Sequence, residues 1–162
     1  MCTYYRQLKN GNIQEFVFEL DRNKYELVNF PPEFEFHFTI YDNHVAFTIN
    51  VDEYKNKGYG TALISIMFEI IEIFYPEIEI IYGWLSTSDY YDYGNNWERS
   101  IPFYLHQKEN AFLIKTSRKL HLIYNTEDVK EVFRKKYYSY KDFIADGIED
   151  GYIIYQMGTY RM

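Results

Sequence analysis

The sequence of 162 residues predicts a single α/β or α+β domain with a mixed, mostly antiparallel central sheet and flanking helices. Two alternating runs, at 33–41 and 44–51, indicate an antiparallel strand pair. An apolar helical segment follows from Gly58, and the run EIEIIYGWL at 77–85 indicates a further strand. Strand, turn, helix and strand make a βαβ unit, which requires a parallel strand pair and a right-handed crossover.

The N-terminal part predicts a hairpin. The alternating runs IQEFVFEL at 13–20 and KYELVNF at 24–30 are separated by a short polar turn at 21–23. The two prolines at 31–32 then interrupt the strand, because proline cannot donate to a ladder of hydrogen bonds.

The segment 33–51 predicts a second hairpin, whose register is set by a two-residue turn at 42–43. The facing pairs are Tyr41 with His44, Ile40 with Val45, Phe38 with Phe47, and Phe36 with Ile49. Because side chains alternate between faces, one face belongs to the core: Phe34, Phe36, Phe38, Ile40, Val45, Phe47, Ile49 and Val51. The other face either meets solvent or lines a site: Glu33, Glu35, His37, Thr39, Tyr41, His44, Ala46, Thr48 and Asn50.

The helix after Gly58 has a wide apolar face, so we expect it to lie flat on the sheet until Pro76 ends it. The outward positions are Glu69 and Glu72. The predicted buried face consists of Leu63, Ile66, Met67, Ile70, Ile71 and Phe74, widened by Ile64, Phe68 and Ile73.

The second half of the chain is less regular. Residues 86–97 are polar and aromatic and indicate a loop at the carboxyl end of the strand 77–85, where ligands bind in open sheets. A short helix with Pro102 near its first turn follows. The runs at 111–115 and 120–125 then indicate a closing hairpin.

The C-terminal extension, 126–157, begins with a capping signal at Thr126, which predicts a helix over 127–146. GYIIYQM at 151–157 indicates a final strand. The basic aromatic run RKKYYSYK at 134–141 is compatible with contact to nucleic acid or an anionic coenzyme, although a solvated helix face is the commoner explanation.

The amino-acid composition argues against several classes of function. A net charge of −7 argues against general nucleic-acid binding, because affinity for phosphate backbones comes from clustered Lys and Arg. No long uncharged apolar run and no secretory leader are seen, and Cys2 is the single cysteine. We therefore expect a cytoplasmic protein without a membrane partner. An acidic surface also suits an amine-bearing ligand, and a homodimer is left open.

The strand, turn and helix at 45–75 have the character of an anion-binding site. A helix start presents unpaired N–H groups and positive potential. Gly58 and Gly60 allow close approach of a ligand to the main chain, and Lys55 and Lys57 add charge. The spacing fits neither the Rossmann fingerprint nor the P-loop, so a different phosphate-bearing ligand is indicated.

The run Lys55-Asn56-Lys57-Gly58-Tyr59-Gly60, followed by Thr61, resembles the coenzyme A pyrophosphate loop of the GNAT superfamily of N-acetyltransferases, with Lys55 in place of the usual Arg or Gln. The resemblance covers a donor-site core of about 33–115. It implies that the sheet contains a splayed parallel pair, that the segment Lys55–Thr61 binds acetyl-CoA, and that main-chain groups of Ile49, Asn50 and Val51 contact its pantetheine arm.

The same resemblance implies catalytic residues. Phe103-Tyr104 match a family pair in which the tyrosine is the general acid, and Asn96 lies one residue from the position of an asparagine that contacts pantetheine. The general base would be His44, at the position where some members carry a glutamate; His37 and Glu35 lie on the same predicted face and are weaker candidates. We expect no metal.

The implied activity is transfer of an acetyl group from acetyl-CoA to a primary amine of a small molecule or protein. The family places two helices between its first two strands, whereas only a short turn separates them here. We expect the helix at 127–146 to replace them at the acceptor site. Two alternatives stay open: a non-catalytic protein of this fold that binds coenzyme A or a protein partner, and an unrelated α/β domain in which the turn is an ordinary one.

Overall fold

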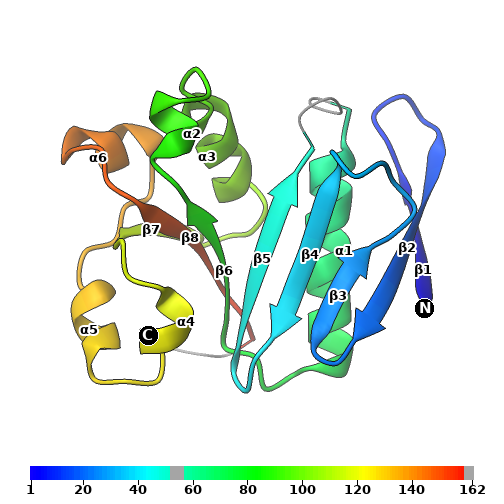
Figure 1. Cartoon of the computed structure of the whole chain (residues 1–162), viewed down its shortest axis with the longest axis horizontal. Helices are drawn as coiled ribbons and strands as arrows, with labels where there is room; N and C mark the ends of the chain where they lie inside the picture. Colours follow the sequence, from blue (N-terminus) through cyan, green and yellow to red (C-terminus); the bar gives the residue numbers. More distant parts are fainter. Residues whose placement is uncertain (52–56, 159–162) are drawn as a thin grey trace. The chain divides into compact units, whose positions relative to one another are not determined.

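The computed structural model describes residues 1–51 and 57–158. The chain divides into two compact units (Figure 1). The first comprises Met1–Glu79 together with the residues from Met157 onward, and the second is Ile80–Gln156. Both combine helices with antiparallel strand pairs, which confirms the predicted mixture of helices and mostly antiparallel strands.

The first unit is a five-stranded antiparallel meander followed by a helix. Each strand pairs with the one before it in the chain. The elements are β1 (Cys2–Gln7), β2 (Ile13–Asp21), β3 (Lys24–Leu27), β4 (Glu35–Ile40), β5 (His44–Asn50) and α1 (Tyr59–Phe74).

Both predicted hairpins are confirmed. In the first, Asp21 faces Lys24 across a turn in which Arg22 has a φ of 60°. In the second, the strand register is the predicted one, with facing pairs Phe36–Ile49, Phe38–Phe47 and Ile40–Val45. The Tyr41 N–H donates to the His44 carbonyl over 2.9 Å, which closes the turn. Strand β1 was not predicted, although its alternating exposure is the pattern of a half-buried strand.

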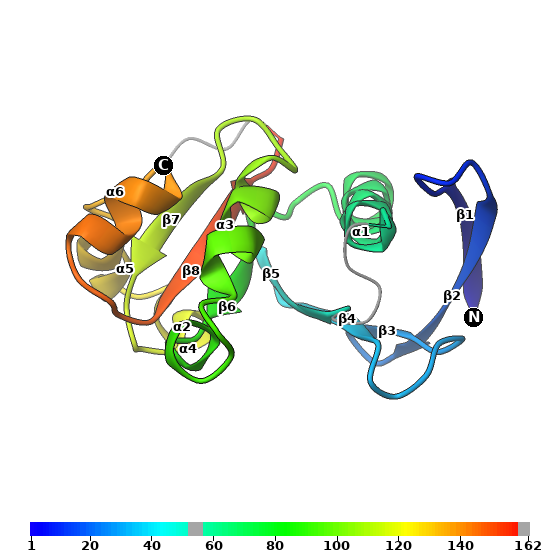
Figure 2. The same ribbon diagram turned by 90° about the horizontal axis from the view of Figure 1, so that it is seen from above.

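Helix α1 lies in the hollow of the curved meander (Figure 2). Its buried residues form the face that the sequence predicts, and the aromatic side chains Phe18 of β2 and Phe38 of β4 are fully buried as well. The last turn departs from the prediction, because Ile73 and Phe74 are each 62% exposed. Helical periodicity fixes a direction around the axis but not the point along it where the covering sheet ends.

Glu69 was expected to face solvent, but it lies half-buried beside β1. The Arg6 Nη2 donates to Glu69 Oε1 over 2.8 Å, and the Arg6 Nε donates to Ser65 over 3.3 Å. These contacts join the edge strand to the helix.

The second unit is built on three strands with the C-terminal strand in the middle. β8 (Gly151–Gln156) pairs with β6 (Ile80–Leu85) on one side and with β7 (Phe112–Lys115) on the other, antiparallel in both cases. Five short helices surround this sheet: α2 (Ser88–Tyr91), α3 (Trp97–Leu105), α4 (Leu120–Ile123), α5 (Asp128–Val132) and α6 (Tyr140–Ala145).

Helices lie on both faces of β8. On one face the Tyr152 hydroxyl accepts from the Leu120 N–H over 3.2 Å, at the start of α4. On the other face the Tyr155 hydroxyl donates to the Tyr104 carbonyl of α3 over 2.7 Å. Because the strand is covered on both sides, residues 151–155 are all buried.

Two predictions for this unit are wrong. The run at 120–125 forms α4 instead of a strand, and β7 pairs with β8 instead. The helix predicted over 127–146 is instead two short helices, α5 and α6, so no single long helix is available for the role expected at the acceptor site. The chain between them is extended at Tyr137, whose N–H and C=O bond to Leu113 over 2.9 and 2.8 Å, and this bridge interrupts the helix.

The parallel pair predicted between the strands at 44–51 and 77–85 would join the two units, and it stays a prediction. Within residues 1–51 and 57–158, no helix has the length and apolar character that crossing a membrane requires.

Candidate functional site

The candidate site is the junction between β5 and α1, in the first unit. Strand β5 ends at Asn50, and α1 begins at Tyr59. Two of the predicted coenzyme contacts, Lys55 and Asn56, lie outside the described residues. The described part of the site consists of the end of the strand and the segment 57–61.

Gly58 occupies the N-cap position of α1 in the left-handed region, with φ 94° and ψ 0°. A Cβ at this position would lie 3.3 Å from the Lys9 backbone N and 3.4 Å from its Cγ. The Lys9 N–H also donates to the Lys57 carbonyl over 3.3 Å. Glycine is thus required for its conformation and for the close approach of the β1–β2 turn, a contact that the sequence did not reveal.

The first turn of α1 carries donors that the helix itself cannot satisfy. The Ala62 N–H donates to the Gly58 carbonyl over 3.1 Å, and it is the first intrahelical donor. The N–H groups of Gly60 and Thr61 precede it, so they have no acceptor within the helix. The first turn has no acidic residue, so no side chain within that turn opposes the positive end of the helix dipole.

The side chains of this segment divide into two groups. The Tyr59 ring packs edge-on against Phe16, Phe30 and Phe34, with ring centroids 6.3, 5.9 and 5.6 Å apart. This aromatic cluster anchors the start of the helix to the sheet. Lys57 and Thr61, by contrast, are exposed. Among the described residues of the predicted loop, 57–61, the exposed side chains are therefore one cation and one hydroxyl. Together with the main-chain N–H groups of the first turn they form a set suited to an anion.

The predicted pantetheine contacts lie at the end of β5 that leads into this loop. Asn50 is exposed and faces Glu35 across the hairpin, while Ile49 and Val51 are half-buried. Their main-chain contact to a ligand stays a prediction.

Two other predicted residues belong to the second unit, on α3. Burial, with the Asp89 carboxylate as a smaller cause, raises the pKa of the Tyr104 hydroxyl far above its ordinary value. Asn96 lies at the N-cap position of α3, where its Oδ1 accepts from Arg99 over 3.2 Å.

His44, the predicted base, is only 2% exposed, although its place beside a hairpin turn suggests exposure. Its Nδ1 lies 2.9 Å from the Asn43 Oδ1, and its ring stacks on Tyr41 with centroids 4.9 Å apart. Its role as a base stays a prediction.

His37 and Glu35 lie on the polar face of β4, with the His37 Nε2 3.4 Å from a Glu35 carboxylate oxygen. Two effects on this imidazole compete. Burial and the Lys24 charge lower its pKa, whereas Glu35 and Glu26 raise it, and the lowering dominates. His37 is therefore neutral at neutral pH and able to accept a proton.

In the described part of the chain, no three His, Cys, Asp or Glu side chains are grouped as ligands for a metal ion. No family model matches the sequence, and comparisons with curated proteins and with solved structures also give no match.

Proposed function

We propose that the chain binds acetyl-CoA and transfers the acetyl group to a primary amine of a small molecule or protein. The observation that carries the proposal is the left-handed Gly58 at the N-cap of α1, followed by a first turn without acidic side chains. This geometry suits a pyrophosphate, and it falls in the segment that resembles the coenzyme loop of the GNAT superfamily.

Different residues of the chain would bind the coenzyme and transfer protons. The N–H groups of Gly60 and Thr61 and the charge of Lys57 would hold the pyrophosphate, and main-chain groups of Ile49, Asn50 and Val51 would align the pantetheine arm. Acyl transfer to an amine also needs an acid for the leaving thiolate and a base for the ammonium. Tyr104 is the proposed acid, because it matches the tyrosine of the family pair, and its hydroxyl is protonated at neutral pH. His44 is the proposed base.

Thr61→Glu tests the donor site. Thr61 is exposed in the first turn, where a carboxylate is favourable for the helix but repels a pyrophosphate. We expect the affinity for coenzyme A, measured by titration calorimetry, to fall by about tenfold or more while the melting temperature is unchanged or higher. The matched control is Ile73→Glu, which places the same charge at the exposed far end of the same helix. Wild-type protein that does not bind coenzyme A, or equal affinity in the two variants, would refute the site.

A second candidate function is binding of coenzyme A without transfer of an acetyl group. The burial of His44 favours it, because a general base has to reach the acceptor amine. A panel of primary amines with acetyl-CoA separates the two. Free thiol released in an amine-dependent manner supports the transferase, and Tyr104→Phe is then expected to lower the rate. Coenzyme A binding without amine-dependent thiol release supports the non-catalytic candidate.

A further inference from the structure

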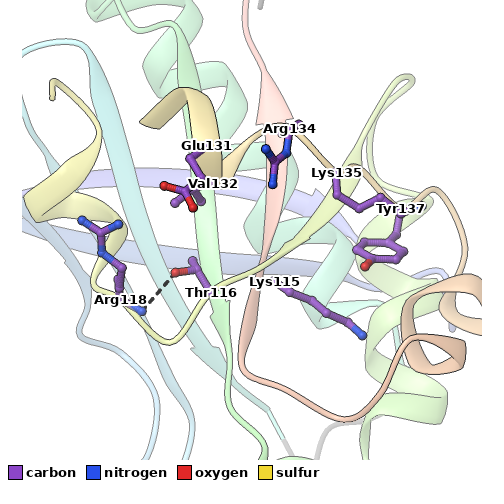
Figure 3. Close-up of a pocket in the computed structure, with 8 residues that line it drawn as sticks. All are labelled: Lys115, Thr116, Arg118, Glu131, Val132, Arg134, Lys135 and Tyr137. Atoms are coloured by element: carbon purple, nitrogen blue, oxygen red, sulfur yellow. Dashed lines mark hydrogen bonds between the residues drawn. The ribbon is translucent and has the colours of Figure 1, made fainter. Parts of the chain in front are cut away.

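A cationic pocket lies in the second unit. It has a volume of about 260 Å³ and is bordered by the end of β7, by α5 and by the chain that follows each of them (Figure 3). This volume is slightly below the range of about 300–1,000 Å³ for drug-sized ligands, so it suits a small molecule.

The walls of the pocket are held by hydrogen bonds. The chain carrying Arg134 and Lys135 leads into Tyr137, which is bonded on both sides to Leu113 of β7. On the opposite side the Arg118 guanidinium forms an ion pair with Asp128 of α5, and the Arg118 N–H donates to Thr116 Oγ1 over 3.1 Å. The lining side chains thus start from backbone that is fixed without a ligand.

The charges in the pocket are unbalanced. Its lining contains four cationic side chains, from Lys115, Arg118, Arg134 and Lys135, and one carboxylate, from Glu131. The Arg118 charge is matched by Asp128, but in the residues that the structure describes neither Arg134 nor Lys135 forms an ion pair. In a chain with a net charge of −7, such a surplus of positive charge in one pocket favours an anion.

Lys115 is the cation that solvent reaches least easily. Its Nζ donates to the Gly147 carbonyl over 2.6 Å and lies 5.2 and 5.1 Å from the ring centroids of Tyr137 and Phe143. Burial lowers the pKa of this ammonium, against the opposing charges of Glu149 and Asp146. A partly dehydrated cation gains more from a neighbouring anion than a fully hydrated one does.

We propose that this pocket binds a small molecule that carries a phosphomonoester group. Arg134 offers a planar pair of donors suited to phosphate oxygens, Lys135 and Lys115 add point charges, and Thr116 lies beside them as a hydroxyl donor. A dianion matches a pocket with a surplus of cationic lining residues better than a single carboxylate does. The small volume and the Glu131 carboxylate fit a nucleic-acid backbone poorly, because such a ligand needs an extended basic track.

The test is a titration of the full chain with glucose 6-phosphate at constant ionic strength, followed by amide chemical shifts, with glucose as the neutral control. We expect saturable shifts at Thr116, Arg118 and Lys135 with the phosphate ester and none with glucose. Equal responses to the two sugars, or no response to either, would overturn the proposal.

Charge-matched variants separate the pocket from a general charge effect. Arg134→Gln combined with Lys135→Gln should weaken binding by about tenfold or more. The control pair Lys130→Gln and Lys141→Gln, both exposed and outside the lining, removes the same charge and should bind like the wild type. Glu131→Gln should strengthen binding. Equal weakening by the two double variants would show that no defined site exists.

Discussion

The two units of the chain bury their strands in different ways. In the first unit the strands alternate between buried and exposed residues, as in the pattern of β4, because α1 covers one face. In the second unit β8 is buried at every residue from Gly151 to Tyr155, since helices lie on both faces. A strand that is covered on one face has apolar residues at every second position of its sequence. A strand that is covered on both faces lacks this alternation.

The helices of the two units also differ, in their length and in the extent of their apolar faces. α1 has 16 residues and an apolar face that is continuous over most of its length, whereas each of the five helices in the second unit has nine residues or fewer. Short helices depend on tertiary contacts for their stability. The first unit is thus specified largely by local pattern, and the second by contacts between distant segments.

The largest effect that tests this comparison is expected from Phe38→Ala in the first unit. Phe38 is fully buried, and its ring stacks on Tyr25 with centroids 4.9 Å apart. Removing a buried phenylalanine ring should lower the free energy of unfolding by about 3–5 kcal/mol, measured by urea denaturation. Leu20→Ala, on β2 of the same sheet and 46% exposed, is the control and should cost less than about 1 kcal/mol. Similar losses in both variants would contradict the one-sided core.

A smaller effect is expected from Gly151→Ala in the second unit. A Cβ at Gly151 would clash with the Ile114 carbonyl oxygen of the paired strand and would lie 3.0 Å from the Phe143 ring. Overpacking between two covered faces should cost about 1–3 kcal/mol or more in urea denaturation. Gly94→Asn is the control, because Gly94 has open space around it and a φ of 64°, which asparagine tolerates. A neutral Gly151→Ala would show that the covering of β8 is loose.

The smallest effect concerns pH and the hydroxyl pair of the first unit. The Tyr25 and Tyr75 hydroxyls lie 2.9 Å apart, and burial, together with this bond, raises the pKa of Tyr25 above its ordinary value. As the pH rises, the unfolded chain therefore releases this proton at a lower pH than the folded chain does. The resulting stabilisation is fully present below about pH 10 and is lost as the pH rises above that value.

Tyr25→Phe should therefore flatten the alkaline fall in the free energy of unfolding, at a cost of about 1 kcal/mol near neutral pH for the lost hydrogen bond. Urea titrations at a series of pH values measure both quantities, and Tyr91→Phe, 66% exposed, controls for the substitution itself. An unchanged alkaline slope in Tyr25→Phe would show that this hydroxyl is not protected by the fold.

The candidate site shows the same division between local and distant information. The strand and the helix start could be predicted, because Val45–Ile49 alternate and an apolar period of 3.6 follows Gly58. The approach of Lys9 to Gly58 could not, since β1 is distant in the chain and no local pattern links the two. The burial of His44 was also missed, because exposure beside a turn depends on what packs against it.

The sequence by itself determined the two hairpins of the first unit, their register and the buried face of α1, because each follows from side-chain period and turn chemistry over a few residues. Only the tertiary structure decided that β8 lies between β6 and β7, and that Tyr137 interrupts the C-terminal helix by bonding to Leu113. It also decided that Arg134, Lys135 and Lys115 line one pocket. These features join residues that are far apart in the chain. The free energy of each contact depends on a distant residue, which the local sequence pattern does not identify.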